Sequence, residues 1–130
     1  MSDLTEFLLA RIGEDEAVAR AAVSASRAVW EIVPDGRFPW HTGLLIAVVS
    51  STWDACVDPE VAEHTARHDP ARVLAECEAK RRIVADRDRI DRSADGDEWS
   101  MGYSDANYSA AHALASVYAD HPDYLSEWKP

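Results

Sequence analysis

The sequence predicts a single α+β domain, residues 1–130, that is mainly helical. Apolar residues recur at helical spacing over residues 3–29 and again over 70–91, which indicates two long amphipathic helices. Two short runs rich in β-branched residues, 29–33 and 44–53, are typical of strands. We therefore expect a long N-terminal helix, a small antiparallel β-hairpin, a helix that stops and restarts, and a C-terminal helix.

The composition excludes several classes of function. The net charge is −11, from 24 acidic and 13 basic residues, so the chain repels nucleic acid and anionic membranes. The longest apolar run, residues 44–49, is far shorter than the roughly 20 residues that span a bilayer. Asp3 and Glu6 stand where a signal peptide would be basic, and Cys56 and Cys77 belong to no Cys-x-x-Cys pair. We expect a cytoplasmic protein that binds neither nucleic acid nor membranes, with both thiols reduced and Cys77 buried.

The N-terminal helix is predicted to start at Asp3, which can cap it together with Glu6. Gly13 interrupts the pattern and predicts a kink or break, and Asp15 points into the apolar stripe. The stripe is longer than a two-stranded sheet can cover. Its residues are Leu4, Phe7, Leu8, Val18, Ala22, Ala25 and Val29.

The stretch EHTARHDPARVL predicts two helices with a restart between them. Pro59 can open the first helix, and the residue before a proline avoids helical angles, so this helix should stop at Asp69. Asp69 can then cap a second helix that begins at Pro70 and runs to about Asp91. Its expected core face is Val73, Leu74, Cys77 and Val84.

Residues 93–102 are polar and predict a loop, after which Ser104 or Asp105 opens a last helix through Asp120. Trp99 and Tyr103 could form a recognition patch, but the preferred interpretation is that they anchor the loop to the core. Near the C-terminus, Trp128 is expected to pack back together with Leu125. The buried stripe of the last helix is predicted to be Ala110, Leu114, Val117 and Tyr118.

His64 and His68 are the only candidates for a metal site. Their spacing puts both rings on one helix face, but the glutamate of the His-Glu-x-x-His motif is absent. A third ligand would come from elsewhere, with His112, Asp120 and His121 as the options. The alternative is a pair of surface or capping histidines, which we prefer, because zinc takes three or four ligands. No pattern predicts a catalytic residue or a bound cofactor.

Three segments resemble DUF6221, an uncharacterised family of small actinobacterial and actinophage proteins. They are DLTEFLLARIGEDEAVARAA at 3–22, HTARHDPARVLAECEAKRRIV at 64–84 and YADHPDYLSEWKP at 118–130. Many relatives carry a Cys- and His-bearing insert before the last helix, whereas residues 91–107 hold no cysteine here. If the insert binds zinc in relatives, this chain has lost that site. The resemblance implies no activity and assigns no site residues.

These observations favour a small cytoplasmic accessory or interaction protein, of phage origin if the resemblance holds, that acts by binding and not by catalysis. The expected partner is another protein or a second copy of the chain, docked on the apolar stripe of the N-terminal helix. The alternative function is a metal-binding module or metal-dependent enzyme centred on His64 and His68.

Overall fold

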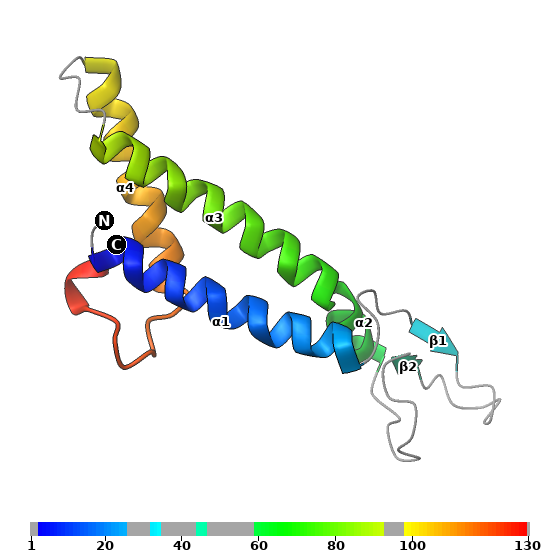
Figure 1. Ribbon diagram of the computed structural model, residues 1–130. Helices are drawn as coiled ribbons and strands as arrows, with labels where there is room; N and C mark the ends of the chain where they lie inside the picture. The colour runs from blue at the N-terminus through cyan, green and yellow to red at the C-terminus, as the bar shows by residue number, and fades with distance from the viewer. Residues whose placement is uncertain (1–2, 26–31, 35–43, 47–58, 93–97, 130) are drawn as a thin grey trace. The chain divides into compact units, whose positions relative to one another are not determined.

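The computed structural model describes residues 3–25, 32–34, 44–46, 59–92 and 98–129 (Figure 1). Two three-residue strands, β1 (Ile32–Pro34) and β2 (Leu44–Ile46), pair antiparallel with Val33 opposite Leu45. All the other regular structure in these ranges is helical. It comprises α1 (Asp3–Ala25), α2 (Pro59–Arg67), α3 (Pro70–Arg92), α4 (Glu98–Ser116) and a short 3-10 helix, η1 (Ser126–Trp128).

The predicted α+β class is wrong, and the described chain is a helical protein. Strands over 29–33 and 44–53 were expected to form a small antiparallel β-hairpin with helices packed on one face. The described ranges contain only the two three-residue segments, and a two-stranded ribbon of that length cannot form a sheet layer. Residues 29–31 and 47–53 of the expected strands lie outside the described ranges. The mainly helical part of the prediction agrees with the structure.

The chain divides into two compact units, which we call unit 1 and unit 2. Unit 1 holds residues 1–15 and 76–130, and unit 2 holds residues 16–75. Both α1 and α3 contribute residues to each unit. In unit 2, α2 lies beside β1 and β2. The single-domain assignment stays a prediction.

Unit 1 has a core of leucine, aromatic and small side chains. The N-terminal part of α1 supplies its large apolar residues at helical spacing, and α4 supplies alanines that allow close approach of the helices. Asn107 is also buried, and its side-chain amide donates a hydrogen bond of 3.3 Å to the Ile83 carbonyl. The buried apolar residues of the unit are Leu4, Phe7, Leu8, Ile12, Cys77, Val84, Ala111, Ala115 and Trp128.

The expected break in the N-terminal helix does not occur. α1 is continuous from Asp3 to Ala25 and passes through Gly13. One glycine costs a helix only about 1 kcal/mol relative to alanine, which packing of the flanking turns can offset. Leu8 and Ile12, which precede Gly13, are among the most buried side chains of the chain.

The helix restart around Asp69 is confirmed. α2 ends at Arg67 and α3 begins at Pro70. The Asp69 carboxylate accepts a hydrogen bond of 2.8 Å from the Arg72 amide in the first turn of α3, as a helix-capping side chain does.

Replacing Asp69 by alanine should therefore lower the free energy of unfolding by about 0.5–2 kcal/mol, because the first-turn amide of α3 loses its acceptor. Urea denaturation followed by circular dichroism measures the change. Asp69→Asn is the matched control, since asparagine caps as well as aspartate. Equal stability of the alanine and asparagine variants would contradict a capping role.

The predicted core faces are only partly right. Cys77 is buried and is a thiol, as expected, while Cys56 lies outside the described residues. The predicted stripe of the last helix is only partly right: Ala110, Leu114 and Tyr118 are half-buried, but Val117 is exposed and follows the end of α4. The buried residues of α4 are Asn107, Ala111, His112 and Ala115.

Candidate protein-binding surface

The histidine pair lies on α2 as the spacing predicts. The His64 and His68 ring centroids are 4.5 Å apart, and both side chains are exposed. Of the proposed third ligands, His112 is buried in unit 1, where its Nδ1–H donates to the Trp128 carbonyl at 3.0 Å. His121 contacts Arg11, and Asp120 is exposed. Across the described ranges no three His, Cys, Asp or Glu side chains gather closely enough to hold a metal ion.

Arg11 forms a polar cluster in unit 1 that sequence reasoning missed, because it occupies the apolar face of α1. Its side chain is only 10% exposed, and its guanidinium lies 5.4 Å from the centre of the Phe7 ring. Nη1 meets the ring nitrogens of His121, and Nη2 donates to Glu14 at 2.7 Å. A guanidinium can only donate, so a ring nitrogen of His121 accepts. The contacts with His121 attach the segment that follows α4 to α1.

A second cluster explains the aspartate that interrupts the apolar stripe. The Tyr118 hydroxyl donates to the Asp15 carboxylate at 2.6 Å, and Lys80 Nζ lies 3.4 Å from the same hydroxyl. Burial, with the hydrogen bond to Asp15 and the charge of that carboxylate, raises the pKa of Tyr118 above its ordinary value. Because Asp15, Tyr118 and Lys80 contact one another, we interpret them as structural groups and not as a reactive site.

The raised Tyr118 pKa predicts a specific loss of stability in alkali. An unfolded tyrosine ionises near pH 10, whereas the folded protein holds this proton more tightly. The stabilisation is therefore fully present below about pH 10 and is lost as the pH rises through the folded-state pKa. Denaturation of the wild type and of Tyr118→Phe from about pH 8 to about pH 11 measures it. We expect the difference in the free energy of unfolding between the two proteins to narrow above pH 10. A difference that stays constant would contradict the raised pKa of Tyr118.

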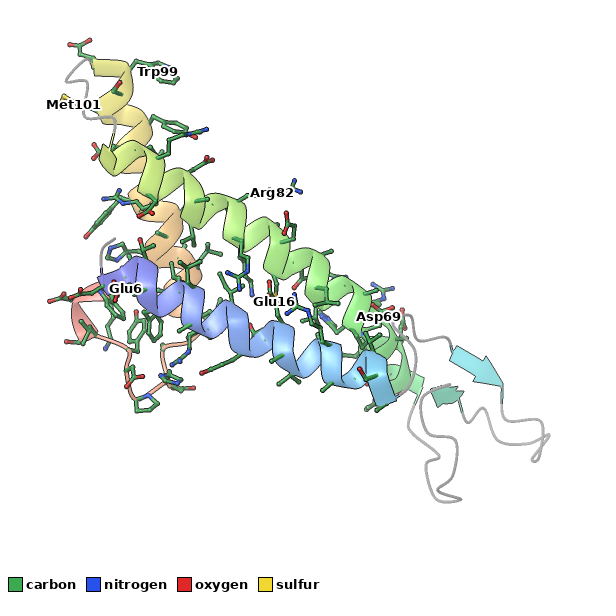
Figure 2. All side chains as sticks on the ribbon, viewed as in Figure 1. Glu6, Glu16, Asp69, Arg82, Trp99 and Met101 are labelled. Carbon is green, nitrogen blue, oxygen red and sulfur yellow. The ribbon has the colours of Figure 1, made fainter. Side chains whose placement is uncertain are left out.

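The first half of α4 carries large apolar side chains that are exposed among the described residues. Trp99 is 75% exposed, and its ring stacks on that of Tyr103, with centroids 5.6 Å apart and planes 4° apart. Met101 projects from the opposite side of the helix from Trp99 (Figure 2). Tyr108 is also exposed, with the Arg87 guanidinium 5.2 Å from its ring centre. We call these exposed side chains the α4 aromatic surface: Trp99 and Tyr103 on one side of the helix, and Met101 and Tyr108 on the other.

The exposure of this surface follows from where α4 begins. Residues 98–102 were expected in a loop, but the helix starts at Glu98. Helical spacing then places Asn107, Ala111 and Ala115 on the buried face, and Trp99 and Tyr103, four residues apart, on its flank. The preferred prediction that Trp99 and Tyr103 anchor a loop to the core is wrong. Trp99 and Tyr103 are adjacent and exposed, and a group of exposed apolar side chains of this kind marks an interaction site.

Within the described part of the chain, no helix is both long and apolar enough to cross a membrane. Comparison with curated proteins and with solved structures gave no match. A family model described as "Family of unknown function (DUF6221)" matches residues 1–130. The chain therefore belongs to the DUF6221 family, as the three sequence segments predicted.

Proposed function

We propose that the protein acts in the cytoplasm by binding another protein, and that the α4 aromatic surface is the binding site. The observation that carries the proposal is the exposure of Trp99, which stacks on Tyr103 on the flank of the buried face of α4. Tryptophan and tyrosine are enriched among the residues that contribute most to protein–protein binding. A tryptophan ring held on the surface contributes little to folding, so binding is the role that its position supports.

The homodimer through the apolar stripe of α1 stays a prediction. Val18 of that stripe is exposed, whereas Leu4, Phe7 and Leu8 are buried inside unit 1. A second copy could therefore not reach them without unfolding the unit. Among the described residues, the exposed aromatic side chains Trp99, Tyr103 and Tyr108 lie on α4, and for this reason we place the partner there.

Site-specific crosslinking tests the proposal directly. A photoreactive amino acid replaces Met101 within the surface or, as a matched control, Val117, which is exposed outside it. Both proteins are irradiated in extract of the source organism, and the adducts are identified by mass spectrometry. We expect a discrete protein adduct at position 101 that is absent at position 117.

The double variant Trp99→Ala/Tyr103→Ala should then abolish the adduct at position 101, whereas Leu125→Ala should leave it unchanged. Removing two central aromatic side chains typically costs more than 1 kcal/mol each, so the combined loss of affinity should exceed roughly thirtyfold. Adducts that form equally at positions 101 and 117, or that persist in the double variant, would contradict the proposed function.

A further inference from the structure

We infer that the partner presents a cationic amphipathic helix to the α4 aromatic surface. This inference rests on the proposed function and adds the chemistry of the partner. Three independent features of α4 support it: the distribution of charge, the shape of its outer face, and the stacked aromatic pair.

The charge of this part of the chain has one sign. Residues 93–128 contain seven acidic residues and no lysine or arginine. On α4 itself, Glu98 and Asp105 are exposed and lie seven residues apart, on the same side of the helix. A segment with lysine or arginine on its surface is therefore electrostatically matched to α4.

The outer face of α4 leaves room for a closely packed helix. At 100° per residue, Gly102 and Ala106 lie between the two carboxylates on one side and Trp99 with Tyr103 on the other. Both small residues are exposed, and a Cβ atom added to Gly102 would meet no atom within 4 Å. This strip of small residues allows a partner helix to approach, with its apolar side chains against the rings and its cations toward Glu98 and Asp105.

The aromatic rings also favour a cation. Guanidinium and ammonium groups bind the faces of tryptophan and tyrosine rings, with tryptophan the strongest. Unit 1 uses this interaction internally, since Arg87 lies 5.2 Å from the Tyr108 ring centre and Arg11 lies 5.4 Å from that of Phe7. Trp99 and Tyr103 stack on each other, and the exposed face of Trp99 can receive a cation from outside.

A second copy of the chain is a poorer occupant. Its cations concentrate in α3, where the exposed Arg82 and Arg89 already pair with Glu78 at 3.2 Å and Asp86 at 2.9 Å. Two copies, each with a net charge of −11, also repel. Nucleic acid would place phosphates beside Glu98 and Asp105, which is unfavourable.

Two synthetic helical peptides test the inference. They share one apolar face of leucine and alanine, and the polar face is lysine in the first and glutamate in the second. Fluorescence anisotropy measures the binding of each labelled peptide to the full-length protein. We expect the lysine peptide to bind at least about tenfold more tightly and to weaken as salt rises from about 0.05 to about 0.5 M.

Matched charge variants locate the binding. Glu98→Gln/Asp105→Asn and the control Asp120→Asn/Glu127→Gln each remove two exposed carboxylates and raise the net charge equally. The first should weaken binding of the lysine peptide by roughly fivefold, and the control by less than twofold. Trp99→Ala/Tyr103→Ala should weaken it by at least about tenfold.

Equal weakening by the two charge variants would overturn the inference, because net charge alone would then explain binding. Equal affinity for the glutamate peptide, or a dimer mass by light scattering that depends on Trp99, would overturn it as well. The proposed function is tested separately, by the crosslinking experiment. If crosslinking at Met101 captures a protein while the lysine peptide does not bind, the proposed function stands and the cationic partner is wrong.

Discussion

Replacing Trp128 by alanine should lower the free energy of unfolding by about 3–5 kcal/mol, the largest effect that we expect from one substitution in this chain. The side chain is 6% exposed, and its ring lies 4.9 Å from that of Phe7 and 5.7 Å from that of Tyr124. Truncation removes the contacts that hold η1 against α1. It also loosens the backbone carbonyl that accepts from the buried His112. Urea denaturation followed by far-UV circular dichroism measures the loss.

Trp99→Ala is the matched control, because it removes the same side chain from an exposed position. It should change the free energy of unfolding by no more than about 0.5 kcal/mol. The two substitutions should therefore have different effects. Loss of Trp128 should lower the stability of the fold, and loss of Trp99 should lower the affinity for the partner. Similar losses of stability in the two variants would show that Trp99 belongs to the core, which would also remove the basis of the proposed function.

Local signals predicted the helices and one boundary because their causes are local. The Asp69–Pro70 pair ends α2 and starts α3 through backbone restrictions and a side-chain cap that involve neighbouring residues only. Cys77 and Val84 follow the apolar period of α3 and are buried. Trp128 packs back as expected, whereas its predicted companion Leu125 is exposed.

The buried face of α4 could not be predicted from its apolar residues. Alanine is abundant along this helix, so burying one alanine stripe instead of another changes little in apolar area. Contacts with residues distant in the sequence decide which face of α4 is buried. Asn107 contacts Ile83, and His112 contacts Trp128. Asp15 was an anomaly in the stripe of α1 for the same reason, because its partner Tyr118 is 103 residues away.

The candidate site was predicted only as a rejected alternative. Trp99 and Tyr103 stood out as possible recognition residues, but a polar sequence at 93–102 favoured a loop, and a loop places no constraint on which way their rings face. Once α4 starts at Glu98, helical geometry brings the two rings together on the flank of the buried face. For His64 and His68 the local prediction was right, but it did not lead to a site. Their spacing correctly placed the rings together, yet spacing cannot supply a third ligand.

Leu8→Ala should lower the free energy of unfolding by about 2–5 kcal/mol, whereas Val18→Ala on the same helix should be neutral or slightly stabilising. The sequence placed both residues on one apolar stripe. In the structure Leu8 is 1% exposed and Val18 is 72% exposed. Loss of Leu8 leaves a cavity among the buried residues of unit 1. Loss of the exposed valine removes little contact, and alanine is the better helix former by about 0.5 kcal/mol.

Thermal denaturation of the two variants beside the wild type decides this prediction. If both substitutions destabilise the protein alike, the apolar stripe of α1 is covered along its whole length. Val18 would then have to be covered, although it is exposed in the structure. If Val18→Ala is neutral and Leu8→Ala is costly, the buried part of the stripe lies in the N-terminal part of α1. Leu8 then stabilises unit 1 as one of its buried apolar residues, together with Phe7 and Ile12.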